Sequence, residues 1–349
     1  MKKILFTGGG SAGHVIPNLA LIDDLLAKGN VDICYMGTEG IEKRIVDERK
    51  LPFYTIHCPK LIRGGWKKLP ENLKIPFAFH RAVKEAEKGL CLYKPDLVFS
   101  KGGYVSLPVV FAARKLNIPC LAHESDLSVG LANRLSAGKC EYVFTSFPET
   151  ADKIRNGKYS GAPMRRSLLD ASKQSAREEF DIPKRAKVLL VFGGGSGSAA
   201  INEAVRKSLK TLTKKYFVLH VCGKGNTIHT NLKNYLQKEF IADMGAAYAC
   251  ADGIIARSGS GTVFEILALK KPALFIPLEG QTRGDQKENA EYFRRKGLCH
   301  VLAQSQLENL PEEVEQLFSD KKLKDELSSG AMLWGNDTII KEMKRILEI

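Results

Sequence analysis

A histidine and two carboxylates follow one apolar segment in the first half of the chain. His123, Glu124 and Asp126 come directly after the run 118–122, which has the composition of a buried strand. An imidazole beside carboxylates can take a proton from a hydroxyl nucleophile within hydrogen-bond reach. The same cluster also fits an acidic turn that caps a helix. Glu124 with Asp126 could contact a divalent ion, although no second acidic pair nearby completes a ligand set.

Two glycine-rich segments each follow an apolar strand and precede a helical pattern. Residues 8–13 spell Gly-x-Gly-x-x-Gly after the run 4–7, and residues 193–198 follow the run 188–192. Backbone N–H groups and the positive end of a helix dipole suit a phosphate at such a turn, although a glycine turn can also serve close packing alone. The acidic residue that would bind a nicotinamide ribose is missing at the end of the second strand. The pattern therefore favours phosphate binding, above all at 193–198, and argues against a nicotinamide cofactor.

Two later segments carry polar side chains suited to sugar hydroxyl groups. The small-residue loop 257–261 leads into a helix, and Glu265 lies within the first turns of that helix. A carboxylate there can accept hydrogen bonds from both hydroxyls of a ribose, or it can simply interact favourably with the helix dipole. Residues 283–289 concentrate side chains able to bond sugar hydroxyls, and a solvated helix N-terminus would have a similar composition.

The segment 60–84 combines cations with large apolar side chains. It holds Trp66, Leu73 and Phe77 and one acidic residue, Glu71. Its basic residues are Lys60, Arg63, Lys67, Lys68, Lys74, Arg81 and Lys84. Each cation near an anionic headgroup contributes about 1 kcal/mol, so the segment predicts docking on an acidic lipid surface. An amphipathic core helix with a basic polar face, or a surface for single-stranded nucleic acid, would have a similar composition.

The elements that must position these residues alternate between short apolar runs and stretches of helical period. The expected strands are 4–7, 33–36, 97–100, 120–122, 142–145, 188–192, 218–221, 253–256 and 273–277. This alternation predicts parallel sheets covered by helices on both faces. Because the opening of strand, glycine turn and helix at 3–14 recurs at 187–198, we expect two similar α/β domains that join near 161–165. The run 338–349 predicts an amphipathic helix.

The composition is that of a folded chain. The sequence has 349 residues, with 53 Lys and Arg against 39 Asp and Glu and a net charge of +14, which excludes a disordered or collagen-like polymer and favours anionic partners. No apolar run is long enough to span a membrane, and the first residues lack a signal-peptide core, so we expect a cytoplasmic protein. The 8 cysteines are well separated and predict buried free thiols rather than disulfides or a zinc site.

The order of the motifs is more specific than any one of them. Over essentially its whole length the chain resembles the MurG family of peptidoglycan N-acetylglucosaminyltransferases. The segments that carry the resemblance are 8–18, 101–106, 123–124 with 130–133, 161–165, 193–198, 246–252, 257–265, 285–286 and 289–290. It implies a GT-B glycosyltransferase, with two Rossmann-like domains of parallel sheets facing a central cleft. The acceptor domain is expected over 1–161, with a C-terminal helix of about 336–349 packing back on it, and the donor domain over 162–335.

The implied reaction is an inverting transfer at the cytoplasmic face of the plasma membrane, where the protein would be peripheral. N-acetylglucosamine passes from UDP-N-acetylglucosamine to the C4 hydroxyl of undecaprenyl-diphosphoryl-N-acetylmuramoyl-pentapeptide (lipid I), which becomes lipid II in peptidoglycan synthesis. The resemblance implies no cofactor and leaves Mg²⁺ open. The implied partners are UDP-N-acetylglucosamine, lipid I at an anionic membrane and other cell-wall synthesis proteins, with no nucleic acid.

The resemblance also implies roles for individual residues. Glu265 would bind the ribose, the Ile241 backbone the uracil, and Asp285 with Gln286 the N-acetylglucosamine hydroxyls. The expected donor set is Arg165, Gly195, Ser196, Gly197, Ile241, Met244, Thr262, Glu265, Asp285 and Gln286. The set expected at the acceptor diphosphate is Ser11, Ala12, Gly13, Gly103, Tyr104 and Asn133. The set expected at the membrane is Arg63, Trp66, Lys67, Lys68, Leu73 and Phe77. The candidates for the general base are His14, Glu124 and Asp126, and their spacing does not choose among them.

Three departures from the family pattern concern substrate preference rather than reaction class. Ala12 replaces a usual glycine, Ser125-Asp126 replaces Gln-Asn, and Asp285 replaces a His or Gln. The alternative of the same fold is a UDP-N-acetylglucosamine 2-epimerase, which has no use for the segment 60–84. A basic nucleic-acid-binding protein is an alternative of a different class, although no nucleic-acid module is present. An NAD-dependent oxidoreductase is opposed by the missing acidic residue.

Overall fold

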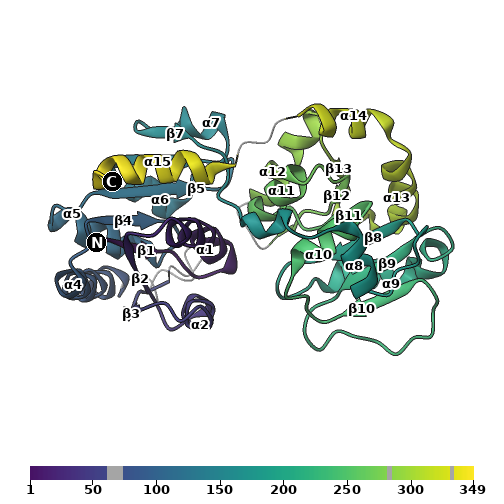
Figure 1. The fold of residues 1–349 in the computed structure, drawn as a ribbon, viewed down its shortest axis with the longest axis horizontal. Coiled ribbons are helices and arrows are strands. Elements are labelled where there is room, and N and C mark those ends of the chain that lie inside the picture. Colours follow the sequence, from purple (N-terminus) through teal and green to yellow (C-terminus); the bar gives the residue numbers. More distant parts are fainter. Residues whose placement is uncertain (61–73, 281–284, 331–333) are drawn as a thin grey trace. The chain divides into compact units, whose positions relative to one another are not determined.

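The computed structural model describes residues 1–60, 74–280, 285–330 and 334–349, which form two compact units (Figure 1). The first unit contains Met1–Arg165 and Leu333–Ile349, and the second contains Arg166–Met332. The division therefore follows Arg165, at the end of the segment 161–165 in which we expected the join. Of the helices in these described ranges, none has both the length and the apolar character that a bilayer crossing needs.

A parallel sheet forms the centre of the first unit. Its strands are β1 (Lys2–Thr7), β2 (Val31–Gly37), β3 (Phe53–Thr55), β4 (Leu97–Ser100), β5 (Cys120–Glu124), β6 (Tyr142–Thr145) and β7 (Gly157–Tyr159). They lie in the order β3-β2-β1-β4-β5-β6-β7. The order reverses between β1 and β4, and open α/β sheets bind ligands at the carboxyl ends of the strands beside such a reversal.

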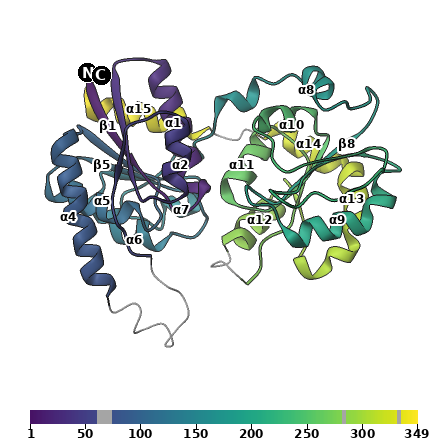
Figure 2. The same ribbon diagram turned by 90° about the horizontal axis from the view of Figure 1, so that it is seen from below.

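Helices cover both faces of this sheet. They are α1 (Ala12–Ala27), α2 (Ile41–Glu48), α4 (Ile75–Tyr93), α5 (Ser106–Lys115), α6 (Leu131–Ser136), α7 (Pro148–Ala151) and α15 (Gly335–Leu347), with the 3₁₀ turn η2 (Ala137–Lys139). Successive residues of β1 point to opposite faces, so Ile4 and Phe6 pack with α1 and α15 whereas Leu5 packs with α4 and α5. Figure 2 shows α1 beside α15.

The C-terminal helix belongs to the first unit because both its apolar face and its first turn are fixed there. Ile339, Met343 and Leu347 are buried in the same cluster as β1 and α1. At the start of the helix, the Asn336 side chain accepts a hydrogen bond from Met164 N (2.8 Å) and donates to Met164 O (3.0 Å). Its amide also donates to Asp24 Oδ2 at 2.8 Å. These contacts keep the segment up to Arg165 in the first unit, which explains why the division falls later than residue 161.

The second unit repeats the architecture. Its strands are β8 (Val188–Phe192), β9 (Phe217–Val221), β10 (Tyr235–Lys238), β11 (Gly253–Ala256), β12 (Ala273–Phe275) and β13 (His300–Val301). They form a parallel sheet in the order β10-β9-β8-β11-β12-β13. Its helices are η3 (Arg166–Leu169), α8 (Lys173–Glu179), α9 (Ala199–Leu212), α10 (Met244–Cys250), α11 (Ser260–Ala268), α12 (Asp285–Arg295), η4 (Gln304–Asn309), α13 (Leu310–Ser319) and α14 (Lys321–Ser329). Two parallel α/β sheets confirm the predicted fold class.

The cysteines are all free, but they are not all buried. Cys34, Cys120, Cys222, Cys250 and Cys299 are buried, and Cys58 and Cys140 are partly exposed. Cys91 is exposed, so the prediction of buried thiols was wrong there. The reason is its position in α4, where the neighbouring Leu90 faces the sheet and Cys91 faces outward.

Candidate active site

In the second unit, the glycine loop after β8 leaves the N-terminus of α9 accessible. Gly197 has a φ of 79°, and a Cβ there would lie 2.3 Å from the Cys222 carbonyl oxygen, so only glycine fits where this loop meets the loop after β9. Around Gly194 and Gly195 a Cβ would meet nothing within 4 Å, and Ser196 is exposed. The N–H groups and dipole at the start of a helix of this length suit a diphosphate.

Arg257 ties this loop to the rest of the unit. Its side chain is buried and donates to Ser198 Oγ (2.8 Å) and Gln304 Oε1 (2.7 Å). It also donates to the carbonyl oxygens of Ile276 (3.1 Å) and Pro277 (2.9 Å), just after β12. Burial lowers the pKa of Arg257, but a guanidinium stays charged at neutral pH. Arg257 begins the predicted loop 257–261, but this role could not be predicted, because its partners come from three distant segments.

Glu265 has an orienting partner that we did not expect. The buried Tyr248 hydroxyl, from α10, donates to Glu265 Oε2 at 3.1 Å. The ring of Tyr248 packs edge-on against Phe192 at the end of β8, with centroids 5.9 Å apart. Thr262 lies one turn earlier on α11 and is partly exposed. The Glu265 carboxylate, which we predicted at the ribose, is therefore oriented by a tyrosine that packs against the end of β8.

The other predicted donor residues lie at the starts of helices or near them. Ile241 is buried just before α10, which begins at Met244, and Asp285 begins α12. Gln286 Oε1 accepts a hydrogen bond from Leu278 N at 3.0 Å, so the Gln286 side chain has a role within the unit and would bond a sugar through its amide nitrogen. Arg165 belongs to the first unit, unlike the rest of the donor set.

In the first unit, the glycine loops after β1 and β4 meet beside His14. Gly103 has a φ of 80°, and a Cβ there would lie 2.5 Å from Gly9 O and 3.2 Å from His14 Nδ1. His14 is partly exposed, and its Nδ1 lies 3.0 Å from Ser11 Oγ. When Nδ1–H donates to Ser11, Nε2 carries no proton, which is the state a general base requires.

Glu42 lies beneath the first glycine loop and was not predicted there. Its carboxylate is wholly buried and accepts hydrogen bonds from Gly10 N (3.1 Å), Thr38 N (3.1 Å) and Thr38 Oγ1. The N–H group of Gly10 is therefore already used within the unit. Residues 11–13, where α1 begins, remain the part of the loop that could meet a phosphate. Tyr104 lies next to this loop, since a Cβ at Gly10 would meet its ring at 2.6 Å.

Glu124 and Asn133 hold the loop that follows β5. The observed β5 extends to Glu124, two residues further than expected, and Glu124 is 5% exposed. Its carboxylate accepts from Asp126 N (3.1 Å), Gly130 N (2.7 Å) and Asn133 Nδ2 (2.9 Å). Asn133 is also buried and donates to His123 O at 3.1 Å. This geometry supports the acidic-turn interpretation of Glu124.

Lys101 is a buried cation at the carboxyl end of β4. It is 2% exposed, and its ammonium donates to Ser125 Oγ. Burial lowers the pKa of Lys101 to about 8, although Glu124 and Asp126 act in the opposite direction. Both residues that depart from the family pattern interact with this cation, since the Ser125 hydroxyl accepts a hydrogen bond from it and the Asp126 carboxylate raises its pKa. Lys101 begins the segment 101–106, whose pattern alone does not predict a buried cation.

We expect this lysine to make stability depend on pH. The pKa of about 8 lies below that of an exposed lysine, so the unfolded chain binds the proton more tightly. The free energy of unfolding should then rise from about pH 8 to about pH 10, by up to about 1.4 kcal/mol per pH unit. Lys101→Met should remove this rise, whereas Lys153→Met, at an exposed site, should keep it. Urea unfolding at several pH values would measure it, and parallel curves for wild type and Lys101→Met would contradict the assignment.

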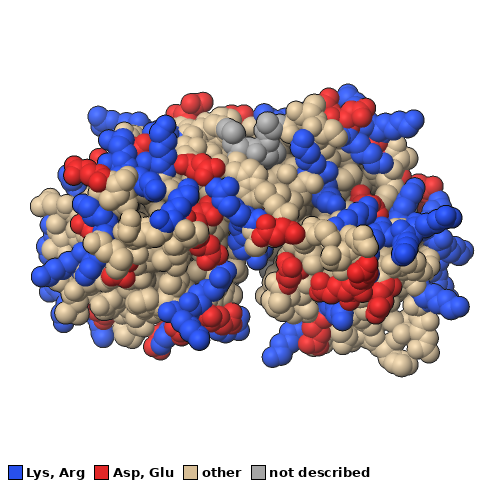
Figure 3. Space-filling model, in the orientation of Figure 1, with Lys and Arg blue, Asp and Glu red and all other residues tan. Residues whose placement is uncertain are grey.

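The predicted membrane segment is described only in part. Arg63, Trp66, Lys67, Lys68 and Leu73 lie outside the described residues. Phe77, in the first turn of α4, is 83% exposed. Lys74, Arg81 and Lys84 are also exposed, and their spacing puts them on the same stripe of the helix as Phe77. Figure 3 shows Lys and Arg spread over the visible faces of both units, so this stripe is distinguished by its exposed aromatic ring rather than by charge alone.

Within the described residues, no three His, Cys, Asp or Glu side chains form a group that could hold a metal ion. Sequence models of two domains match the chain, the first within the first unit and the second over most of the second unit and part of α15. The glycosyltransferase family 28 N-terminal domain matches residues 4–145, and the glycosyltransferase family 28 C-terminal domain matches residues 188–343.

Two curated proteins similar to the chain share one name. A Clostridium novyi (strain NT) protein is 42% identical over 341 residues, which are 94% of this chain and 94% of that protein. A Clostridium perfringens (strain SM101 / Type A) protein is 43% identical over 312 residues, 87% of this chain and 86% of that protein. Both are named UDP-N-acetylglucosamine--N-acetylmuramyl-(pentapeptide) pyrophosphoryl-undecaprenol N-acetylglucosamine transferase.

Solved structures resemble the chain over both units. The crystal structure of Acinetobacter baumannii MurG has a TM-score of 0.76 and 26% identity, covering 99% of this chain and 100% of that chain. A Staphylococcus aureus MnaA–UDP co-structure has a TM-score of 0.70 at 15% identity and covers 100% of this chain and 97% of that chain. The second likeness concerns the fold alone.

Proposed function

The chain belongs to glycosyltransferase family 28, and from this premise we propose that it transfers N-acetylglucosamine from UDP-N-acetylglucosamine to lipid I, forming lipid II. The observation that carries the proposal is the 42% identity, over 94% of the chain, to a relative named for that reaction. The relatives do not favour the epimerase alternative, because they bear the name of a transferase. In the proposed transfer the nucleotide sugar is the donor substrate and the lipid-linked molecule is the acceptor substrate.

The second unit is the donor site in this proposal. The diphosphate of UDP lies at residues 193–198, where the N-terminus of α9 stabilises the charge that develops as UDP leaves. Glu265, oriented by Tyr248, accepts the ribose hydroxyls. The Ile241 backbone meets the uracil, and Asp285 with Gln286 bonds the N-acetylglucosamine hydroxyls. Arg257 contributes by holding Ser198, the N-cap residue of α9.

The first unit presents the nucleophile. His14 Nε2 takes the proton of the C4 hydroxyl of N-acetylmuramic acid, while Ser11 keeps the imidazole in the required orientation. The C4 oxygen forms a bond to the anomeric carbon as the bond from that carbon to the UDP oxygen breaks, and UDP leaves with the electron pair. A single displacement inverts the anomeric configuration. The acceptor diphosphate lies at residues 11–13, near Gly103 and Tyr104.

The proposed chemistry uses no cofactor. The leaving diphosphate meets the N-terminus of a 14-residue helix, whose dipole and N–H groups can carry the stabilisation that a metal ion supplies in other transferases. Transfer rates measured with a chelator and with added Mg²⁺ address this part of the proposal. Equal rates would support it, and loss of activity with the chelator would contradict it.

Peripheral docking through the stripe on α4 is the proposed route to a membrane-bound acceptor. Phe77→Ser should weaken binding to anionic vesicles about tenfold or more, because a buried aromatic side chain contributes roughly 1.5–3 kcal/mol. Leu92→Ser is the matched control, since Leu92 is 73% exposed on the same helix but lies near its other end, about four turns after Phe77. Vesicle co-sedimentation measures the binding, and UDP affinity should not change in either variant. Equal vesicle binding by the two variants would exclude Phe77 from docking.

Product analysis with labelled donor tests the function as a whole. With UDP-N-acetylglucosamine and a lipid I analogue, we expect the label in a disaccharide-linked lipid and an equal amount of UDP. With donor alone, we expect neither UDP release at a comparable rate nor a new sugar nucleotide. Formation of an epimerised donor without acceptor would support the alternative instead.

A further inference from the structure

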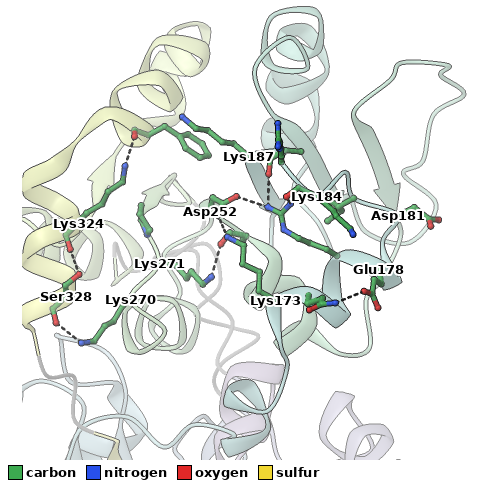
Figure 4. Close-up of a pocket in the computed structure, with 18 residues that line it drawn as sticks. Lys173, Glu178, Asp181, Lys184, Lys187, Asp252, Lys270, Lys271, Lys324 and Ser328 are labelled. Carbon is green, nitrogen blue, oxygen red and sulfur yellow. Dashed lines mark hydrogen bonds and ion pairs between the residues drawn. The ribbon is translucent and has the colours of Figure 1, made fainter.

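A cavity in the donor unit lies at the edge of the sheet opposite the glycine loops. It has a volume of about 1230 Å³. Among the residues that line it, Lys187 comes just before β8, Asp252 just before β11, and Lys271 just before β12 (Figure 4). The cavity therefore opens at the amino ends of these strands, whereas the loops assigned to UDP follow their carboxyl ends.

The lining is strongly cationic. Its basic residues are Lys173, Arg177, Lys184, Arg185, Lys187, Lys270, Lys271 and Lys324. Its acidic residues are only Glu178, Asp181 and Asp252. The cations come from three separate parts of the unit: α8 with the segment up to β8, the turn before β12, and helix α14. Segments distant in sequence thus bring an excess of five positive charges to one cavity.

Asp252 is the carboxylate at the centre of this cluster, and it balances only part of the charge. Its oxygens lie 2.5 Å from Lys173 Nζ and 3.4 Å from Arg177 Nη2. Figure 4 shows Lys271 beside this group, with Lys270 and Lys324 on one side and Lys184 on the other. The Lys271 ammonium donates to the carbonyl oxygens of Ala249 (3.3 Å) and Ala251 (2.8 Å), and burial, together with the nearby Lys173, lowers its pKa.

The remaining cations have no carboxylate partner within the part of the chain that the structure describes. Lys270 and Lys324 donate instead to the carbonyl oxygens of Ser328 (2.7 Å) and Phe318 (2.6 Å). Lys184 and Lys187 are exposed at the mouth and form no ion pair with any described residue. An anion that enters the cavity would therefore gain attraction from several lysines without displacing an existing ion pair.

We propose that this cavity binds a compact anion that carries at least two phosphate groups. Lysine ammonium groups are point charges with three donors each, which suits phosphate oxygens arriving from several directions. A ligand with one carboxylate would leave most of the excess charge uncompensated. The site is separate from the donor loops and does not depend on the proposed transfer reaction. The phosphates could belong to a soluble molecule or to the headgroup of an acidic lipid.

Titration of the full chain with inorganic triphosphate tests the proposal. Saturating UDP is present throughout, so that the loops at the carboxyl ends of the strands are occupied. We expect wild type to bind triphosphate, and the triple variant Lys184→Gln, Lys187→Gln, Lys324→Gln to bind it about tenfold or more weakly. The matched control is Lys210→Gln, Lys214→Gln, Lys233→Gln, which removes the same charge from exposed sites of the same unit outside the cavity.

A parallel assay with phosphatidylcholine vesicles that contain diphosphatidylglycerol, whose headgroup carries two phosphates, distinguishes the two sources of phosphate. Triphosphate binding that is lost only in the cavity variant identifies a soluble ligand, and vesicle binding lost only in that variant identifies a headgroup. Either result supports the site. Equal behaviour of the cavity and control variants toward both probes, or no binding by wild type to either, would overturn it. Unchanged UDP affinity in both variants shows that the unit is still folded.

Discussion

His14→Ala lowers kcat for sugar transfer by about 10²–10⁴-fold and leaves the Kd for UDP unchanged, because the side chain acts on the acceptor hydroxyl rather than on the donor. The expectation follows from the position of the imidazole. It lies where the loops after β1 and β4 meet, is partly exposed, and has Nδ1 3.0 Å from Ser11 Oγ. Single-turnover transfer with a lipid I analogue measures the chemical step, and calorimetry measures UDP binding.

Variants of Ser11 and of the two other candidates for the general base, Glu124 and Asp126, serve as the comparison for His14→Ala. Ser11→Ala keeps the base but removes its orienting partner, so we expect a loss of only about tenfold. Asp126→Asn should retain most of the activity. Glu124→Gln should lower stability more than kcat, since its carboxylate accepts three hydrogen bonds from the loop it holds. If His14→Ala kept its activity while Asp126→Asn lost it, the general base would be Asp126.

Glu265→Ala weakens UDP binding by about 10²-fold or more, the second large effect that we expect. Each hydrogen bond from a ribose hydroxyl to a carboxylate contributes about 1.5–3 kcal/mol, and two are proposed. Tyr248→Phe leaves the carboxylate in place without its orienting hydroxyl, 3.1 Å away, and should cost about fivefold. Glu203→Ala, at an exposed carboxylate on α9, is the control and should not change UDP affinity.

A modified nucleotide assigns this effect to the ribose. Wild type should bind 2′-deoxy-UDP more weakly than UDP, and Glu265→Ala should bind the two about equally. Should the variant still discriminate between them, the carboxylate that contacts the 2′-hydroxyl would have to be another residue. Calorimetry with each nucleotide gives the four constants that this comparison needs.

The strands in the middle of both sheets could be predicted from the sequence, and those at the edges could not. The missed strands are β3, β7, β10 and β13, each at an end of its sheet. They are short, and their residues are partly or fully exposed, so they lack the apolar run that marks a central strand of a parallel sheet. β8, by contrast, is buried along its whole length and was predicted at its observed bounds.

For the candidate site, too, the sequence allowed prediction of local features but not of contacts between distant segments. The glycine loops and Glu265 could be proposed from the sequence because a helix N-terminus after a strand has a local signature. Tyr248, Arg257, Glu42 and Lys101 act through partners that are distant in the sequence, and only the fold brings them together. The cluster at Glu124 could serve as a base or as a cap, and the backbone N–H groups that face it favour the cap.

A crystal structure of the chain with UDP tests the central claim most directly, namely that the second unit holds the nucleotide sugar. We expect the diphosphate at residues 193–198, the ribose hydroxyls within hydrogen-bond distance of Glu265, and the uracil at Ile241. UDP bound in the first unit at Ser11–Gly13, or bound in the second unit away from Glu265, would contradict the account.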